Sequence, residues 1–325
     1  MRKRDRAAMV RSHRKFSLAR LKTDGYFSRN LKDNIEYYLM MAVPLILIFI
    51  FSYLPMLGLV ISFQDYSAGR PFLGDGVKWV GLKHFSKFVN SYYFPRIIRN
   101  TLVINFLGLL MGFWVPIVFA LVVNEIRHSK FRKFTQTVSY MPNFISTVVV
   151  AGMFLSFIAS DGIVTKMLNA IGIEAKSLNA NKQFFPWLYT FISVWKSFGW
   201  NSILYLSTIT AIDPSLYESA SVDGATRMQK IWYITLPSMM SLIMIQLIFA
   251  IGGMLGSNTD LILLLYNASV YETADVIGTY VYRDTLIGGK YSYGTAAGLL
   301  MSVLSFILVY TANYVARKKT DFSIW

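Results

Sequence analysis

The sequence predicts an all-α integral membrane protein with six transmembrane helices. In this chain of 325 residues, 54% of the residues are hydrophobic, only 15% are charged, and the apolar residues gather in long runs. Soluble domains carry about 25% charged residues. A charge at the centre of a bilayer costs roughly 2.5–3.5 kcal/mol on insertion scales, so the scarcity of charge within the runs fits a lipid environment.

Six apolar segments have the length of about 17–25 residues that a helix needs to cross the hydrocarbon core. They lie at 38–63, 101–123, 138–157, 185–209, 239–255 and 296–315. The first is longer than the apolar region of a signal peptide, about 7–15 residues, so we interpret it as an uncleaved anchor. The fifth is the least regular, because Gly252, Gly253 and Gly256 interrupt it.

The distribution of lysine and arginine predicts the orientation. With the N-terminus in the cytoplasm, the inside segments hold 20 of these residues and the outside segments hold 11. Cytoplasmic segments carry such an excess of positive charge. We therefore expect a multi-pass protein of the cytoplasmic (inner) cell membrane, surrounded by lipid, with both termini in the cytoplasm. The same bias accounts for the net charge of +15, so no nucleic-acid partner is expected.

Motifs for chemistry are missing from the sequence. There is no cysteine, and His13, His84 and His128 fit no ligand spacing, so no metal site is expected. The chain contains no Gly-x-x-x-x-Gly-Lys-Ser/Thr loop for ATP and no carboxylate pair within a predicted span. We therefore predict no catalytic residues, no ATP-binding site and no cofactor on this chain.

The segment 213–237, between the fourth and fifth predicted spans, differs from the other loops. Asp213 is a good helix N-cap, and Pro214 suits the first helical position. Gly224 lets the chain turn as a C-cap glycine does. The pattern predicts a short helix, a glycine turn and a second short helix that starts near Ala225 and ends near Pro237, on the cytoplasmic surface.

This segment resembles the signature loop of type I ABC importer permeases, Glu-Ala-Ala, three residues, Gly, nine residues, Ile-x-Leu-Pro. The matching residues are Glu218, Ser219, Ala220, Gly224, Ile234, Leu236 and Pro237, with serine for alanine at 219 as the single departure. The resemblance implies the type I importer permease fold and a coupling helix that docks in a cleft of a cytoplasmic ATPase subunit. It implies coupling roles for Leu216, Glu218, Ser219, Ala220, Asp223, Gly224, Ala225 and Arg227.

Other segments resemble one subgroup, the polysaccharide and lipo-oligosaccharide permeases, which includes the first permease subunit of alginate importers. These segments are 79–85, 99–102, 137–142, 263–267 and 274–283. The resemblance implies that the chain forms half of the translocation pathway for an oligosaccharide or polysaccharide. It also implies a heterodimer with a second permease, two ATPase subunits that bind ATP and Mg, and an extracytoplasmic substrate-binding protein.

These features suggest how the chain is organised. A basic cytoplasmic segment, 1–36, precedes the first transmembrane helix and an outer loop, 37–96. The permease core follows at 97–315, with the coupling loop at 213–237, and a cytoplasmic tail covers 316–325.

Polar residues within or beside the spans are candidates for the substrate pathway. Lys196 lies about twelve residues into the fourth span, and charged residues at that depth normally face a cavity or a partner. Alternatively, the span starts later and Lys196 reaches the outer interface. The full set of pathway candidates is Asn143, Lys196, Trp200, Asn201, Asn258 and Asp260. The outer segment 256–295 is rich in tyrosine, which is typical of membrane interfaces and also suits contact with sugars.

Two other functions compete with an importer permease. A secondary, ion-coupled transporter predicts acidic residues at mid-membrane, and the six predicted spans contain none. A membrane enzyme acting on lipid-linked sugar needs positioned acid and base groups, which the sequence does not supply.

Overall fold

The computed structural model describes residues 34–172, 178–256 and 259–319. Within these ranges the regular structure is helical, and one isolated bridge between Gln64 and Trp79 is the only β-pairing. The all-α class predicted from the sequence is therefore confirmed. The chain divides into two compact units, Met1–Val60 and Ile61–Trp325. Most of the predicted basic segment, 1–33, and the end of the predicted tail, 320–325, lie outside the described residues.

The first unit contains helix α3 (Ile35–Ile48), which occupies the start of the first predicted span. The helix continues through a π-helical turn, η1 (Phe49–Tyr53), into a 3-10 stretch, η2 (Leu54–Phe63), which crosses the unit boundary. Pro55 has no N–H to donate, and the wider turn before it is one way in which a helix accommodates the missing donor. The combined run of 29 residues is long and apolar enough to cross a membrane.

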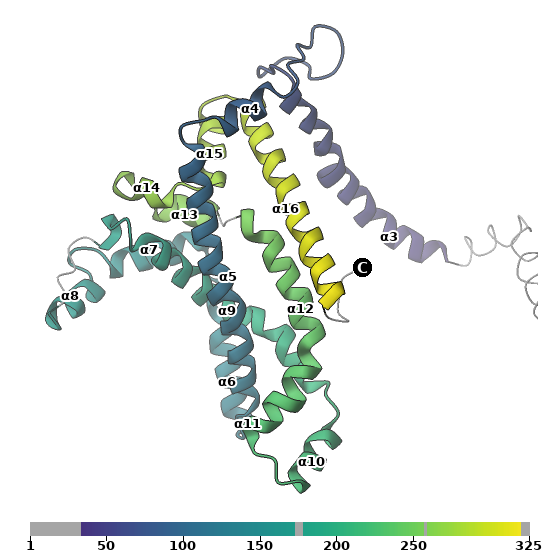
Figure 1. The fold of residues 1–325 in the computed structure, drawn as a ribbon, viewed down its shortest axis with the longest axis vertical. Coiled ribbons are helices and arrows are strands. Elements are labelled where there is room, and N and C mark those ends of the chain that lie inside the picture. Colours follow the sequence, from purple (N-terminus) through teal and green to yellow (C-terminus); the bar gives the residue numbers. More distant parts are fainter. Residues whose placement is uncertain (1–33, 173–177, 257–258, 320–325) are drawn as a thin grey trace, which may run out of the picture. The chain divides into compact units, whose positions relative to one another are not determined.

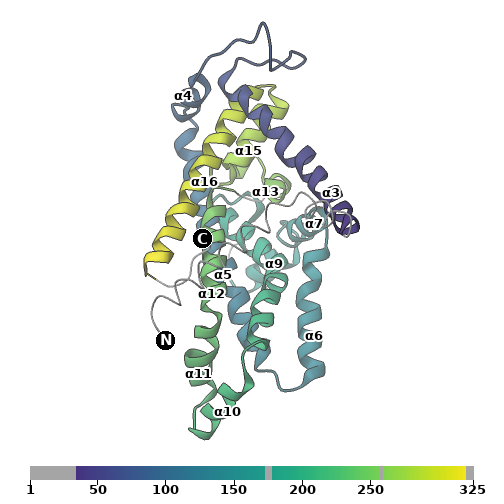
Figure 2. The same cartoon turned by 90° about the vertical axis from the view of Figure 1, so that its right-hand side faces the viewer.

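Three long helices form the centre of the second unit, and a fourth packs against α12. The three are α5 (Phe94–Asn124), α9 (Phe185–Thr210) and α12 (Leu236–Gly252), and the fourth is α16 (Tyr291–Lys319). The three central helices lie alongside one another in both views (Figure 1, Figure 2). Their shared core consists of Phe113, Ile117, Ala120, Val123, Tyr205, Leu206, Ile209, Met239 and Ile243. In lipid, such close side-chain packing is what holds helices together.

The third predicted span, 138–157, is not one straight helix. Helix α6 (Ser129–Tyr140) and the 3-10 turn η3 (Met141–Phe144) are separated from α7 (Thr147–Phe157) by a bend of 99°. Pro142 cannot donate to the carbonyl of Val138, so the α-helical register ends before it. Ile145 and Ser146 are then extended, and α7 starts in a new direction.

Length and apolarity support fewer spans than the six predicted. Among the described residues, four helices are long and apolar enough to cross a membrane, or five if the bent pair forms one span. Helix α9 has 26 residues, which is long enough, but it is not among them. Its polar side chains lower its apolarity; they include Thr190, Ser193, Lys196, Ser197 and Asn201.

The predicted second short helix before Pro237 is part of a longer one. Helix α11 (Arg227–Lys230), the π-helical turn η5 (Ile231–Thr235), α12 and the 3-10 turn η6 (Gly253–Leu255) follow one another as a run of 29 residues. Pro237 was expected to end the helix, but it falls just after the π turn. That turn changes the hydrogen-bond register where the proline lacks its N–H, so the helix continues.

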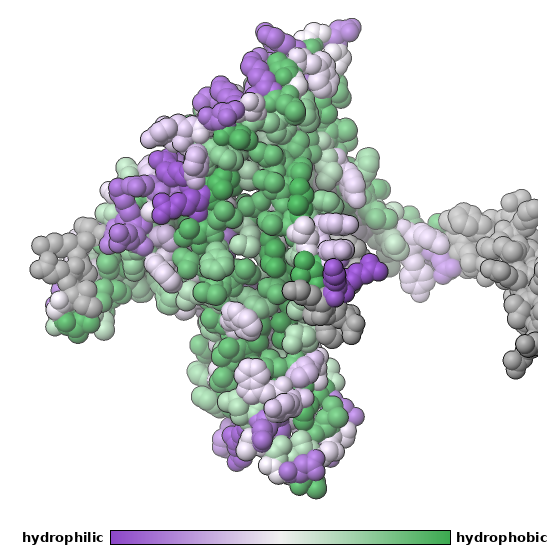
Figure 3. Space-filling model, viewed as in Figure 1, coloured by the Kyte–Doolittle hydropathy of each residue, from purple (hydrophilic) through white to green (hydrophobic). Residues whose placement is uncertain are grey.

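Short helices occupy both ends of the second unit. Helices α4 (Lys83–Val89) and α15 (Ile277–Tyr282) lie where α5 and α16 begin, and α10 (Pro214–Val222) lies at the opposite end (Figure 1, Figure 2). On the face shown in Figure 3, apolar residues cover the middle of the helices and hydrophilic residues gather toward the ends. The other described elements are α8 (Ile163–Ala170), η4 (Leu178–Ala180), α13 (Thr259–Leu265), η7 (Ala268–Val270), α14 (Tyr271–Ala274) and η8 (Arg283–Ile287).

The close approach of α6 and α9 at Gly199 can be tested. A methyl group on the buried Gly199 would collide with the backbone of Ser139, which cannot move as a flexible side chain can. We expect Gly199→Ala to destabilise the purified protein by about 1–3 kcal/mol, the usual cost of overpacking. Gly298→Ala is the matched control, because its added methyl group meets no atom within 4 Å. Equal thermal unfolding temperatures for the two variants would contradict the predicted contact.

Candidate functional site

A well-capped short helix, α10, forms the first part of the predicted coupling loop. Its N-cap is Asp213, whose carboxylate accepts a hydrogen bond of 2.9 Å from the backbone N–H of Ser215. Hydrogen bonds from Ser215 favour the charged form and hold the pKa of the Asp213 carboxyl below its usual value. Pro214 occupies the first helical position, where its missing N–H costs nothing.

The other end of α10 is closed by a glycine turn. Gly224 has a φ of +76°, a left-handed conformation that glycine adopts without strain. The N–H of Ala225 donates to the carbonyl of Ala220 at 2.9 Å, and the N–H of Gly224 donates to that of Ser221 at 3.2 Å. These two bonds form a Schellman cap, which satisfies carbonyls that the helix end would otherwise leave unpaired. The turn chemistry predicted from the sequence is therefore present.

Side-chain hydrogen bonds fasten α10 to the helix that follows it. The hydroxyls of Tyr217 and Thr235 lie 2.9 Å apart, and Thr235 is buried in the π turn η5. Lys230 of α11 donates to the hydroxyl of Ser221 near the end of α10. Sequence reasoning missed both contacts, since each joins residues that no local pattern relates. These two bonds connect α10 to the base of α12.

A capping box starts the helix after the turn. The side chain of Thr226 accepts from the N–H of Gln229 at 3.4 Å, and the Gln229 amide oxygen accepts from the N–H of Thr226 at 2.7 Å. The spacing Thr-x-x-Gln is a readable signal in the sequence, and it marks the start of α11 more closely than the glycine does.

The outward surface of α10 combines apolar and acidic side chains. Leu216 is 49% exposed and Val222 is 89% exposed, beside the carboxylates of Glu218 and Asp223. The exposed members of the predicted coupling set are Leu216, Glu218, Ser219, Asp223, Gly224 and Arg227. Ala220 and Ala225 are half-buried beside a hollow of about 260 Å³. An exposed apolar tip with a charged rim is the composition of a surface that docks on another protein.

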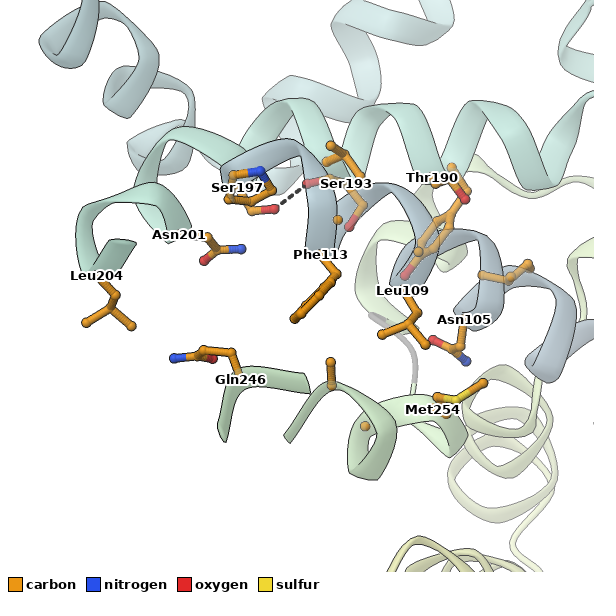
Figure 4. Close-up of a pocket in the computed structure, with 18 of the residues that line it drawn as sticks. Asn105, Leu109, Phe113, Thr190, Ser193, Ser197, Asn201, Leu204, Gln246 and Met254 are labelled. Atoms are coloured by element: carbon orange, nitrogen blue, oxygen red, sulfur yellow. Dashed lines mark hydrogen bonds between the residues drawn. The ribbon is translucent and has the colours of Figure 1, made fainter. Parts of the chain in front are cut away.

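A polar cavity of about 350 Å³ lies between α5, α9 and α12. Asn105 of α5, Asn201 of α9 and Gln246 of α12 contribute amide groups to its lining (Figure 4). Asn201 and Gln246 extend into the same space from their separate helices. The lining adds the hydroxyls of Thr190, Ser193 and Ser197, and no charged side chain lines it among the described residues.

The cavity can exchange hydrogen bonds with a ligand or with water. Thr190 is fully buried, and its hydroxyl has no hydrogen-bond partner among the described residues. The hydroxyl of Ser197 is held by the carbonyl of Ser193 at 2.8 Å, which leaves its lone pairs available as acceptors. Neutral donors and acceptors of this kind suit a ligand rich in hydroxyl groups.

Lys196 lies outside this lining. Its amine donates to the hydroxyl of Thr147 on α7 at 2.7 Å, whereas Asn201, five residues further along α9, lines the cavity. The separation follows from helix geometry, because five residues turn through about 500°, which places the two side chains roughly 140° apart. A role of Lys196 in the substrate pathway stays a prediction.

The other pathway candidates are dispersed. The Trp200 ring packs edge-on against Phe144, with ring centroids 5.5 Å apart, and half-buried Asn143 lies in the same turn η3 as Phe144. Asp260 is exposed on α13. Asn258 lies outside the described residues. Among the residues that the structure describes, no group of three or more His, Cys, Asp or Glu side chains is placed to hold a metal ion.

The fold and these two features define a class of protein: a helical membrane transport subunit with a polar cavity and an exposed, capped surface helix. The chain belongs to the family of binding-protein-dependent transport system inner membrane components, whose family model matches residues 104–321. It is therefore a transport permease of the inner membrane. This membership decides against the secondary transporter and the membrane enzyme.

Curated relatives and solved structures agree with the family. The chain is 41% identical over 283 residues to the polygalacturonan/rhamnogalacturonan transport system permease protein YteP of Bacillus subtilis (strain 168), covering 86% of this chain and 87% of YteP. It is 36% identical over 290 residues to protein LplB of the same organism, covering 89% and 90%. A chain of a bacterial ABC transporter involved in the import of the acidic polysaccharide alginate matches with a TM-score of 0.82 and 40% identity, covering 91% of this chain and 99% of that chain.

The hydrogen bond between Tyr217 and Thr235 makes a testable prediction. Tyr217→Phe removes the hydroxyl and keeps the ring, so it should cost about 0.5–1.5 kcal/mol of local stability. Amide hydrogen exchange across α10 should then become roughly 2- to 10-fold faster while exchange in α5 is unchanged. Tyr233→Phe, at a side chain that is 79% exposed, is the control. Identical exchange in the two variants would show that this bond does not hold α10.

Proposed function

We propose that this chain is one of two permease subunits of an ATP-driven importer, and that it forms half of the pathway for an oligosaccharide or polysaccharide. The observation that carries the proposal is the exposed, doubly capped helix α10, fastened to α12 at one end of a bundle whose interior holds a neutral polar cavity. An importer needs both parts, a surface that receives force from an ATPase and a cavity that can accept a polar solute.

The substrate class rests on the relatives. YteP is described as a permease for polygalacturonan and rhamnogalacturonan, and the similar solved transporter imports alginate. A second solved structure, with a TM-score of 0.81 and 39% identity, shows a bacterial alginate ABC transporter in complex with an alginate pentasaccharide-bound periplasmic protein. Substrate delivery by an extracytoplasmic binding protein follows by analogy for this chain.

The remaining partners complete the proposal. A second, related permease supplies the other half of the pathway, and two ATPase subunits bind ATP and Mg and hydrolyse the nucleotide. Helix α10 docks on one ATPase subunit, so this end of the bundle faces the cytoplasm. The excess of lysine and arginine in the predicted inside segments is the reason to expect both chain termini on the same side. No catalytic residue and no cofactor is assigned to this chain.

Reconstitution tests the substrate class. The complete importer, placed in lipid nanodiscs with its binding protein, should hydrolyse ATP faster when an oligosaccharide is added. A panel of neutral and acidic oligosaccharides of equal length then identifies the sugar. An importer whose ATPase rate responds to amino acids or peptides and to no saccharide would overturn the proposed function.

The glycine turn at the end of α10 provides the test of coupling. Proline cannot adopt the φ of +76° seen at Gly224, and it also removes the N–H that bonds to Ser221. Gly224→Pro should therefore abolish coupled uptake while the chain still inserts and assembles. Gly224→Ala keeps the N–H and costs about 1–2 kcal/mol, so it should retain part of the uptake.

A second positive-φ glycine supplies the control for this test. Gly172 follows α8 with a φ of +85° and donates its N–H to Asn169 at 3.1 Å, as Gly224 does to Ser221. Gly172→Pro imposes the same local disruption far from α10 and should leave uptake near the parent rate. Parent-rate uptake in properly assembled Gly224→Pro would refute the assignment of α10 as the coupling helix.

The composition of the complex is a further prediction. This chain offers one coupling helix, whereas the ATPase subunits are proposed to act as a pair, so a second permease must supply the other. Native mass spectrometry of the intact importer should give one copy of this chain, one of a different permease and two ATPase subunits. An active importer with two copies of this chain and no other permease would exclude the heterodimer.

A further inference from the structure

A second large pocket, of about 660 Å³, lies at the end of the second unit opposite α10. It is formed where α4, α14, α15, η8 and the beginnings of α5 and α16 meet. Among the described residues, its lining contains the cations Lys87, Arg96, Arg283 and Lys290 but only two carboxylates, Asp275 and Asp284. None of these residues belongs to the coupling helix or to the central cavity.

The fully buried carboxylate of Asp275 is already saturated. Arg283 donates to both of its oxygens, at 3.1 and 2.9 Å, and the hydroxyl of Thr279 donates to one of them at 2.8 Å. These bonds to Asp275 raise the pKa of Arg283. The arginine and the aspartate therefore neutralise each other, and their pairing gives the pocket a rigid floor.

Two cations of the pocket are left with little compensation. Arg96 reaches Asp275 through only one nitrogen, at 3.5 Å, and its Nε has no hydrogen-bond partner among the described residues. Lys87 forms no ion pair within the described part of the chain, and its amine lies 5.8 Å from the centre of the Tyr293 ring. Lys290 pairs with Asp284 at 3.5 Å, whereas Arg96 and Arg283 share the single carboxylate of Asp275. The lining therefore keeps two uncompensated positive charges, one on Lys87 and one on the two arginines, of which Arg96 has the weaker contact.

Tyrosines supply the remaining surface. The hydroxyls of Tyr280 and Tyr293, both buried, lie 2.9 Å apart and fix these two rings. Tyr93 is 45% exposed, and Arg96 stacks over its ring at 5.1 Å from the centroid. Fixed aromatic rings and amide or hydroxyl groups such as those of Asn90 and Ser91 can contact the faces and edges of a sugar ring.

We propose that this pocket binds a carboxylated sugar unit, with Arg96 and Lys87 holding the carboxylate and Tyr93 covering the ring. The inference rests on the proposed function and narrows its substrate to acidic oligosaccharides. An arginine pairs with a planar carboxylate through parallel hydrogen bonds, whereas a neutral sugar leaves both cations uncompensated. The pocket lies at the end away from α10, where a solute would enter before it reaches the central cavity.

A small ligand fits the pocket better than an acidic side chain of a partner protein. A single carboxylate reaching in from a protein loop would use one cation and little of the 660 Å³. Volumes of roughly 300–1,000 Å³ with a few placed polar groups are typical of sites for small molecules. The aromatic ring beside the cations also adds contact area that a short acidic side chain cannot use.

Calorimetry on the complete importer in nanodiscs, without its binding protein, tests the proposal with trigalacturonate as the probe. The fully methyl-esterified trisaccharide has the same rings without charge and should bind at least about 10-fold more weakly. Lys87→Gln and Arg96→Gln should each weaken trigalacturonate binding by about 10-fold or more, with little effect on the ester. Lys166→Gln, which removes an exposed charge on α8 outside the pocket, is the matched control and should bind as the parent does.

Arg96→Gln could misfold, because Arg96 contacts the buried Asp275. Lys87→Gln keeps the test valid in that case, because Lys87 contacts no carboxylate in the described residues. Equal affinity for the acid and the ester, or unchanged affinity in both variants, would overturn the proposal. It would also be overturned if trigalacturonate did not bind while Lys87→Gln weakened association with the binding protein, which would make the pocket a protein contact. The proposed function is tested separately, by adding the binding protein to the same nanodiscs and measuring ATP hydrolysis. Hydrolysis that an oligosaccharide stimulates would leave the proposed function standing, and no stimulation by any sugar would refute it.

Discussion

The inability of hydrocarbon to form hydrogen bonds is the constraint on which this structure depends. Each backbone N–H and carbonyl that crosses the membrane must find its partner within the chain, so the chain stays helical even where proline removes a donor. The π turns before Pro55 and Pro237 keep two runs of 29 residues continuous. Polar side chains obey the same rule, as Ser197 does by donating to the carbonyl of Ser193.

This constraint also explains why α9 differs from its neighbours. A helix in the centre of the unit can carry amides and hydroxyls on the side that lines a cavity, because water or a solute satisfies them there. Asn201 lies on that side, and the amine of Lys196, on another side of the helix, donates a hydrogen bond to the hydroxyl of Thr147. As a result, the sequence of α9 is less apolar than that of a lipid-facing helix, although α9 packs against α5 along its length.

Helix α10 connects the end of α9 to the start of α12, and this connection has a mechanical consequence. Helix α10 follows α9 after only three residues, 211–213, and is bonded to the start of α12 through Tyr217 and Thr235. Both long helices line the central cavity, through Asn201 and Gln246. Under the proposed function, a push of an ATPase subunit on α10 acts on two walls of the cavity at once, and the Schellman cap at Gly224 fixes the end of the helix that receives the push.

Features set by neighbouring residues were predictable from the sequence, and features set by distant contacts were not. The all-α class follows from the apolar runs, and the caps at Asp213 and Gly224 follow from local backbone chemistry. The 99° bend after Pro142 was missed, because proline is tolerated within membrane helices and does not by itself indicate a change of direction. The bond of Lys196 to Thr147 joins residues 49 apart in the sequence, and no local pattern indicates such a pair.

The different charges of the two cavities fit the proposed passage of an acidic sugar. A charged site captures a carboxylate at the end where a solute enters, since Arg96 and Lys87 attract it through water. A second charged site at mid-membrane would hold the same anion too tightly, because electrostatic attraction strengthens where water is excluded. The central cavity instead presents only neutral amides and hydroxyls, such as those of Gln246 and Thr190. Movement through a pathway requires binding that is favourable enough for entry and weak enough for release, and this sequence of a charged and then a neutral site satisfies both conditions.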